Sequence, residues 1–120
     1  MPTSQDATVF RWEDLEQDSP MDLITRRRII GDRFMVSEVH LAKGFSVPSH
    51  RHENEQIAMV MHGRIRFTIG EGDAVREETL VGGQVLHLPS DVPHGAEALE
   101  DTLIYDLFSP VSEKTGIDRE

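Results

Sequence analysis

Short apolar segments, separated by turns rich in glycine, proline and aspartate, recur along most of the chain. The segment from Arg64 to Ile69 shows the pattern most clearly, because Ile65, Phe67 and Ile69 alternate with polar side chains. Side chains in a strand alternate between its two faces, so this segment is predicted to form a half-buried strand. Such segments recur about nine times with no convincing helical periodicity, which predicts an all-β sandwich or barrel.

The expected strands lie near residues 9–12, 23–30, 35–41, 57–62, 64–69, 77–81, 84–88, 95–98 and 103–108. A chain of 120 residues is large enough for one domain and too short for two. We expect a mobile N-terminal segment with a short strand over residues 1–20, a barrel over 21–110 and a polar tail over 111–120. Trp12 is interpreted as a packing or dimer contact.

The stretch from Pro48 to Gln56 contains two histidines, and a third, His94, lies far along the chain. His50 and His52 point the same way in an extended strand, about 6.6 Å apart along the backbone. Gln56 returns to that face if the chain stays extended between them. Together these residues could place three nitrogens and an amide oxygen around one metal ion. A histidine pair alone is weak evidence, because strand histidines are usually surface or hydrogen-bonded residues.

The spacing of two blocks adds to this evidence. The first block contains Gly44, His50, His52, Gln56 and Gly63, and the second contains Gly83, Pro89, Asp91 and His94. Over residues 28–110 these blocks resemble the paired motifs of the cupin family. The resemblance implies a single-domain double-stranded β-helix, a jelly-roll barrel, with one metal ion held in its mouth by His50, His52, Gln56 and His94. The chain departs from the family pattern at Gln56, Asp91 and Ala98, where glutamate, glycine and asparagine are usual.

One divalent transition metal ion is the expected cofactor, and these ligands suit Ni, Zn, Fe, Mn or Cu. The chain has no cysteine, so thiolate ligands are excluded. Because Gln56 is neutral, the ion would keep its full charge. We therefore expect a small anionic substrate and a Lewis-acid role for the ion.

Asp106 is a carboxylate within the otherwise apolar run from Leu103 to Phe108. On an inner face it would be desolvated, its pKa would rise, and it could act as a general acid or base. A position facing solvent, or paired with Arg26 or Arg28, is an equal alternative. Phe108 shares the face of Asp106 and could close one side of a cavity.

Within the cupins, the chain most resembles the KdgF group of pectin degradation. The likeness lies in the Glu55–Gln56 pair, the block from Pro89 to Gly95 and the ending from Asp106 to Pro110. It implies conversion of cyclic unsaturated uronates into linear keto acids, with Asp106 moving the proton and Phe108 beside it. A dioxygenase or cyclase for another small substrate, and a non-catalytic module that binds a sugar acid or a metal, are the alternatives.

Other sequence features limit the partners. A formal charge of −10 disfavours nucleic acid. Without a long apolar run, no membrane contact or secretion is expected, and the cytoplasm is the expected compartment. The apolar positions Ile57, Met59 and Met61 suggest a homodimer.

The remaining basic side chains are assigned more loosely. His87 is interpreted as a packed residue of the barrel wall, in preference to a fifth ligand. Arg26 and Arg28 are interpreted as surface ion pairs, with a clamp on a carboxylate as the alternative. Whether these three side chains or Arg66 line the cavity stays open. His40 and His62 are expected at the surface.

Overall fold

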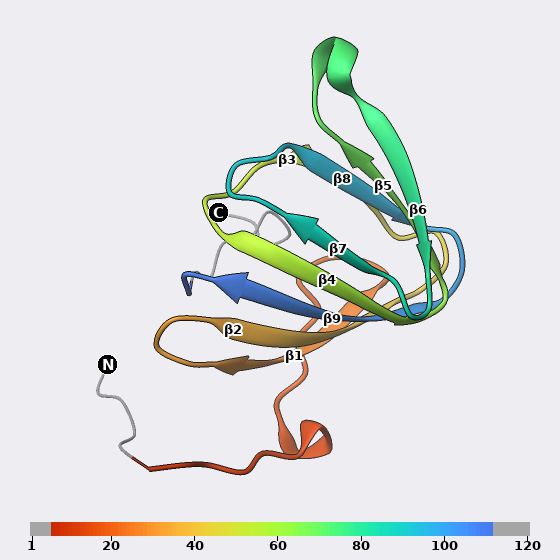
Figure 1. Cartoon of the computed structure of the whole chain (residues 1–120). Helices are drawn as coiled ribbons and strands as arrows, with labels where there is room; N and C mark the ends of the chain where they lie inside the picture. Colours follow the sequence, from red (N-terminus) through yellow and green to blue (C-terminus); the bar gives the residue numbers. More distant parts are fainter. Residues whose placement is uncertain (1–5, 112–120) are drawn as a thin grey trace.

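The structure is a computed structural model that describes residues 6–111. Two antiparallel β-sheets pack against each other, and two short 3₁₀ helices accompany them in this part of the chain (Figure 1). The strands are β1 (Ile24–Ile30), β2 (Met35–Leu41), β3 (Ser46–His50), β4 (Glu55–His62), β5 (Arg64–Ile69), β6 (Arg76–Val81), β7 (Val85–Leu88), β8 (His94–Ala98) and β9 (Thr102–Ser109). The helices are η1 (Trp12–Asp14) and η2 (Gly72–Ala74).

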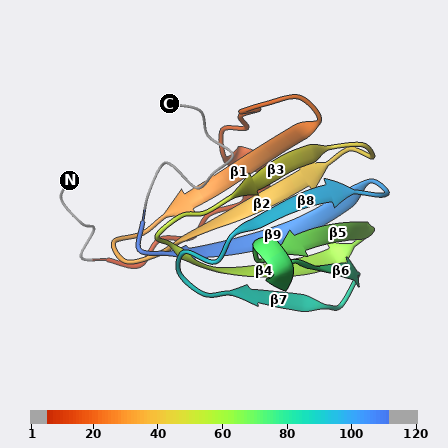
Figure 2. The ribbon, with the colours of Figure 1, turned by 90° about the horizontal axis from the view of Figure 1, so that it is seen from above.

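The strand order mixes segments that are distant in the sequence. One sheet has the order β1-β2-β9-β4-β7 and the other has the order β3-β8-β5-β6. The last strand, β9, thus lies between β2 and β4, and β3 pairs with β8 (Figure 2). This arrangement confirms the predicted all-β jelly-roll fold.

Alternation along the strands separates the core from the outside. In β9 the side chains of Thr102, Ile104, Asp106 and Phe108 are buried, whereas those between them are half-buried on the outer face. The inner faces of the two sheets meet in an apolar core. Its members include Val39, Phe45, Ala58, Val60, Ile65, Phe67 and Ile104. This burial provides the main driving force for folding.

A glycine lets two neighbouring strands of the four-stranded sheet approach closely at one point. A Cβ at Gly95 would lie 2.9 Å from the carbonyl oxygen of Val47 and 3.0 Å from the amide nitrogen of Ser49. Glycine therefore allows β8 to approach the backbone of β3 closely. This approach places His50 directly opposite His94 in the strand register.

One local prediction was wrong. Residues 9–11 form no strand; they are extended and lead into η1, with Val9 95% exposed. Asp18, and not this segment, forms the isolated bridge to Arg26 at the edge of β1. Trp12 does pack, because its ring stacks on Tyr105 with centroids 5.7 Å apart. The chain also bends at Glu53 and Asn54, so the condition under which strand alternation would return Gln56 to the face of the histidines is not met.

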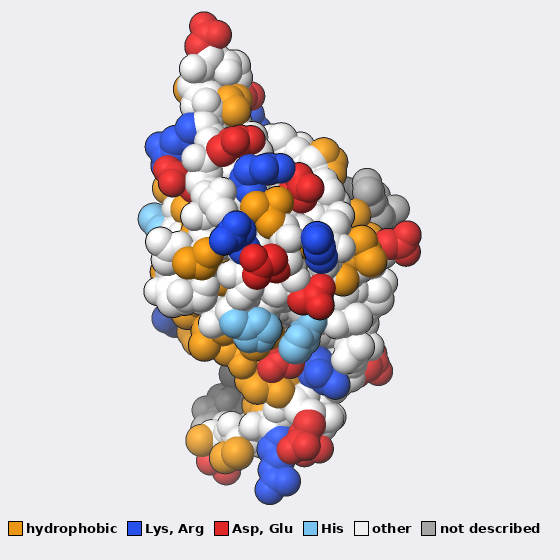
Figure 3. Space-filling model, turned by 90° about the vertical axis from the view of Figure 1, so that its right-hand side faces the viewer, with side chains coloured by type: hydrophobic (Ala, Val, Ile, Leu, Met, Phe, Trp, Pro, Cys, Tyr) orange, Lys and Arg blue, Asp and Glu red, His pale blue; other side chains and the backbone are white. Residues whose placement is uncertain are grey.

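The surface is irregular and mixed in charge. The hairpin of β5 and β6, with η2 at its tip, projects beyond the body of the molecule (Figures 1 and 3). Acidic and basic side chains are interspersed on the face that Figure 3 shows. Across residues 6–111, no helix has the length and hydropathy needed to cross a membrane. Residues 1–5 of the predicted mobile start (1–20) and residues 112–120 of the predicted polar tail (111–120) lie outside the described residues.

Candidate metal centre

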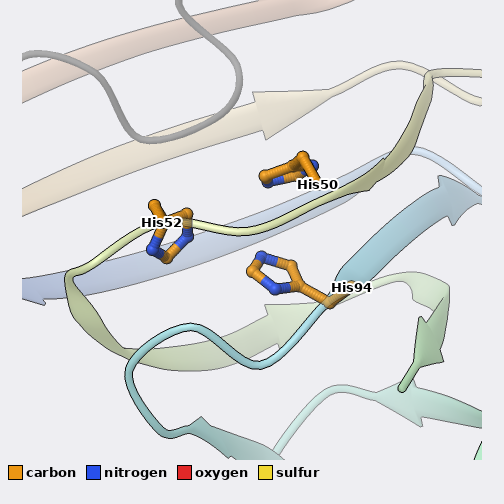
Figure 4. Close-up of side chains that lie close together, drawn as sticks. All are labelled: His50, His52 and His94. Carbon is orange, nitrogen blue, oxygen red and sulfur yellow. The ribbon is translucent and has the colours of Figure 1, made fainter. Parts of the chain in front are cut away.

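Three histidines meet at the end of the barrel where the two sheets separate. His50 ends β3, His94 begins β8, and His52 lies in the loop between β3 and β4. Each contributes one ring nitrogen to a group whose members all lie within 4.8 Å of one another. The three rings point toward a common centre in Figure 4. The structure therefore brings together the three histidines that the sequence singled out, and they could hold a metal ion.

The backbone sets the protonation of these rings. Each Nδ1 lies within hydrogen-bond distance of the carbonyl oxygen of a residue two positions away. The pairs are His50 with Pro48 at 2.9 Å, His52 with Asn54 at 3.0 Å and His94 with Val92 at 2.9 Å. A carbonyl oxygen can only accept, so each Nδ1 carries the proton and donates it. Each Nε2 then presents a lone pair, which is the form that binds a metal ion.

His52 shows that a cation fits this centre. Its Nε2 is buried and has no hydrogen-bond partner within residues 6–111. A buried polar atom without a partner costs about 1–3 kcal/mol, so natural structures rarely leave one unused. A metal ion at the meeting point of the three rings would satisfy this lone pair.

Burial keeps two of the rings neutral. Desolvation lowers the pKa of His94 to about 4, and the nearby His50 and His52 add to this effect. Desolvation also lowers the pKa of His52, and the charge of His50 acts in the same direction. Both rings are therefore in the metal-binding form at neutral pH.

Gln56 connects the histidines to Asp106. It is 7% exposed on the inner face of β4, and its Nε2 donates to Oδ1 of Asp106 over 2.9 Å. The side chain of Gln56 also acts on the His52 ring, where it raises the pKa against the effect of burial. Since the amide nitrogen is directed at Asp106, the amide oxygen is the atom available to the histidines. Strand alternation from His52 does not bring it here, because the chain bends at residues 53–54 and continues into the other sheet.

Asp106 occupies the inner face of β9 and is 6% exposed. Desolvation raises its pKa to about 6, although the hydrogen bond from Gln56 opposes the rise. The inward alternative predicted from the sequence is thus the one observed. The arginine alternative is wrong, because Arg26 and Arg28 both pair with Asp18, whereas Asp106 accepts from Gln56.

A small cavity of about 50 Å³ adjoins the centre. His50, Gln56, His94, Asp106 and Phe108 line it together with apolar side chains of the core. A cavity of this size holds a water molecule or a few ligand atoms, because one water needs about 10–15 Å³ by this measure. Pockets that enclose a whole small-molecule ligand are several times larger, at roughly 300 Å³ or more.

The loop that carries His52 is anchored by another loop. The amide of Asp91 donates to the carbonyl of His52 over 2.9 Å, and Oγ of Ser90 donates to the carbonyl of Glu53 over 2.6 Å. Asp91 adopts a φ of 65°, so it makes the turn where glycine is usual, as predicted. Ser90 and Asn54, which also fixes this loop, were not identified from the sequence. Their roles depend on contacts between distant segments, so no local pattern could have shown them.

Four other basic side chains lie away from the cavity. His87 is 54% exposed and its Nε2 bonds to Glu55, so its predicted place in the barrel wall was wrong. It pairs with Ile57 across the strands, which puts it on the outer face. Arg66 binds Glu97 over 2.6 Å on the other sheet. His40 and His62 are exposed, as predicted.

Comparisons with known proteins agree with this fold. A family model described as "Cupin domain" matches residues 37–107. The structure is similar to KdgF from Halomonas sp., with 26% identity and a TM-score of 0.81, over 91% of this chain and 98% of that one. No curated protein matches the chain.

Two more distant structures show the fold alone. An RmlC-like cupin from Shewanella frigidimarina has 21% identity and a TM-score of 0.81, over 91% of this chain and 96% of that one. Oxalate decarboxylase from Bacillus subtilis has 20% identity and a TM-score of 0.77, over 92% of this chain and 32% of the longer enzyme.

Proposed function

The chain belongs to the cupin family, and from that premise we propose that it is a metal-dependent enzyme acting on a small anionic metabolite. The finer proposal is a KdgF-like isomerisation of unsaturated uronates to linear keto acids. One observation carries this proposal. The buried carboxyl of Asp106 accepts a hydrogen bond from the amide nitrogen of Gln56, and the amide oxygen of Gln56 is available beside the three histidine nitrogens. This joins an ion site and a proton carrier in one cavity.

Four neutral donors would hold the ion, namely Nε2 of His50, His52 and His94 and Oε1 of Gln56. A bound divalent transition ion supplies Lewis acidity, which polarises a carboxylate or a sugar oxygen. Because none of the four donors is charged, the centre retains a net positive charge. That charge favours an anionic substrate even though the chain as a whole carries −10.

Asp106 would move the proton. In the proposed isomerisation the ring C–O bond of the hemiacetal opens, its hydroxyl loses a proton and the vinylic carbon gains one, so the formula of the substrate is unchanged. With a pKa near 6, the carboxyl can give up and recover a proton close to neutral pH. Gln56 holds the carboxyl by donating to Oδ1, and Phe108 lies beside it in the cavity.

The size of the cavity limits how the substrate binds. A space of about 50 Å³ admits the reacting end of a uronate and not the whole ring. The carboxylate and the unsaturated carbons would enter next to the histidines and Asp106. The rest of the sugar would lie in the open mouth of the barrel.

Loss of the conjugated ultraviolet absorbance of an unsaturated galacturonate tests the proposal. The metal-loaded protein should accelerate this loss, and a chelator should abolish the acceleration. Asp106→Asn should do the same, whereas Asp73→Asn, a matched change in the exposed β5–β6 hairpin, should have no effect. A rate for the loaded wild-type protein equal to that without protein would exclude the proposal.

A second candidate function is supported by the cavity lining. Phe45, Phe67 and Phe108 all face the cavity, and such a lining suits an aromatic or other apolar substrate of a dioxygenase or cyclase. Oxygen uptake that depends on added iron and a phenolic substrate would favour this candidate. The absence of such oxygen uptake, together with turnover of the uronate, would reject the dioxygenase or cyclase candidate.

We also propose a homodimer. The outer face of the five-stranded sheet carries half-buried Ile57, Met59 and Leu107, with exposed Met61 and Val85 beside them. An apolar sheet face of this kind suits a second copy of the chain. Light scattering should give twice the mass of 13.6 kDa, and Met61→Lys with Val85→Lys should shift it toward the monomer. A monomeric wild-type mass would refute this part.

A further inference from the structure

We propose that Asn54 is a positioning residue of the metal centre, which holds the ring of His52 and fastens its loop to the end of β9. The inference rests on the metal site of the proposed function. It adds a residue that touches neither the ion nor the substrate. Its evidence lies in the contacts of one loop, residues 51–54.

Asn54 is buried to an unusual degree for a polar side chain, with 2% of its surface exposed. It makes two contacts in opposite directions. Its backbone carbonyl oxygen accepts from Nδ1 of His52 over 3.0 Å, and its side-chain Nδ2 donates to the backbone carbonyl oxygen of Pro110. A buried amide is costly unless its hydrogen bonds are made, so both contacts constrain where this residue can sit.

His52 needs such support more than the other two histidines do. His50 and His94 belong to paired strands, and the register of β3 with β8 holds them opposite each other. His52 lies outside the strands, so no strand register fixes its backbone. Of the anchors of this loop, Asn54 is the one whose own backbone also bonds the His52 ring.

The hydrogen bond from Asn54 to Pro110 ties the loop of His52 to β9, the strand that carries Asp106. Pro110 follows Phe108 by two residues and Asp106 by four, at the end of β9. Through this bond the loop of His52 keeps a defined place relative to the strand that carries Asp106. Asn54 thereby sets both the direction in which Nε2 of His52 points and its distance from the carboxyl.

Substitution at Asn54 tests this role. Asn54→Ala removes the donor to Pro110 and leaves the backbone carbonyl in place. Titration of the metal-free protein with Ni²⁺ in a calorimeter should show affinity weakened about 10- to 100-fold, the usual effect of losing a residue that orients a ligand. The control is Ser90→Ala, which removes another anchor of the same loop without a contact to the ring, and it should change the affinity less than about threefold.

The tautomer of His52 provides a readout that needs no metal. Ring ¹⁵N shifts of the apo protein should show Nδ1 protonated in the wild-type protein and a mixture of tautomers in Asn54→Ala. Wild-type His52 protonated at Nε2 would overturn the inference, even if the variants fail to fold. A folded Asn54→Ala protein with unchanged tautomer and affinity would also overturn it.

The same measurements separate this inference from the proposed function. A wild-type protein that binds no metal would reject the proposed function, while the tautomer comparison would still decide the role of Asn54. If Asn54→Ala does not fold, Asn54→Asp keeps the shape of the side chain but cannot donate to Pro110 when ionised. It is expected to give the same change in tautomer.

Discussion

Replacement of Asp106 by asparagine should make the metal-free protein more stable at neutral pH. The carboxyl is 6% exposed, and burial raises its pKa from the ordinary 3.8 to about 6. Between these two values the unfolded chain has lost the proton while the folded chain keeps it. Ionisation of the folded protein therefore costs free energy that the unfolded chain does not pay. Asparagine removes this cost, and its Oδ1 can still accept from Gln56.

The magnitude follows from the two pKa values. The interval from 3.8 to about 6, at about 1.4 kcal/mol for each pH unit, corresponds to about 3 kcal/mol. The stabilisation by Asp106→Asn should reach this value above pH 7, decline as the pH falls through 6 and vanish only well below the ordinary pKa of 3.8. The lowered pKa of His94 makes both proteins less stable as the pH falls below 6.5. Taking the difference between the two proteins cancels this effect.

Urea denaturation with chelator present, followed by tryptophan fluorescence at pH 8.0, 6.0 and 4.5, measures the difference. The free energy of unfolding of Asp106→Asn should exceed that of the wild-type protein by about 2–3 kcal/mol at pH 8.0 and by less than about 1 kcal/mol at pH 4.5. A difference that does not change with pH, or a less stable variant at pH 8.0, would refute the assignment of a desolvated carboxyl at this position.

Three further substitutions address the site and its support. Gly95→Ala places a Cβ 2.9 Å from the carbonyl oxygen of Val47, so it should destabilise the protein by about 1–3 kcal/mol in urea denaturation and weaken Ni²⁺ binding in calorimetry. Gln56→Glu adds a negative ligand and removes the donor to Asp106; it should tighten Ni²⁺ binding and slow turnover of the uronate in the absorbance assay. Trp12→Ala removes the stack on Tyr105 and should cost about 1 kcal/mol in thermal unfolding, without changing the affinity for Ni²⁺. Unchanged stability for the first or third, or weaker Ni²⁺ binding by the second, would contradict these assignments.

Local patterns predicted the strands well where a strand and its turns are contiguous. The segment from Met35 to Leu41 forms β2 with the expected bounds, and Arg64 to Ile69 forms β5. The turn at Gly63 is local as well, with a φ of 99° that glycine adopts easily. The segment near Val9 failed because a strand also needs a partner edge, and alternation contains no information about pairing.

The candidate site was only partly predictable for the same reason. Spacing identified His50, His52 and His94, and alternation placed Asp106 on one face with Phe108. The neutral state of His94 and the raised pKa of Asp106 depend on how deeply the fold buries them. The role of Asn54 requires Pro110, which lies 56 residues away in the sequence, to pack against it.

The position of the histidines between the two sheets has a consequence for motion. His50 and His94 come from one sheet, while Gln56 and Asp106 come from the other. A cation bound there would link the two sheets at this end of the barrel. It would slow the local opening motions that separate them. Amide hydrogens near the ends of β3 and β9 should then exchange with solvent more slowly after metal is added, whereas those at the opposite rim should exchange as before.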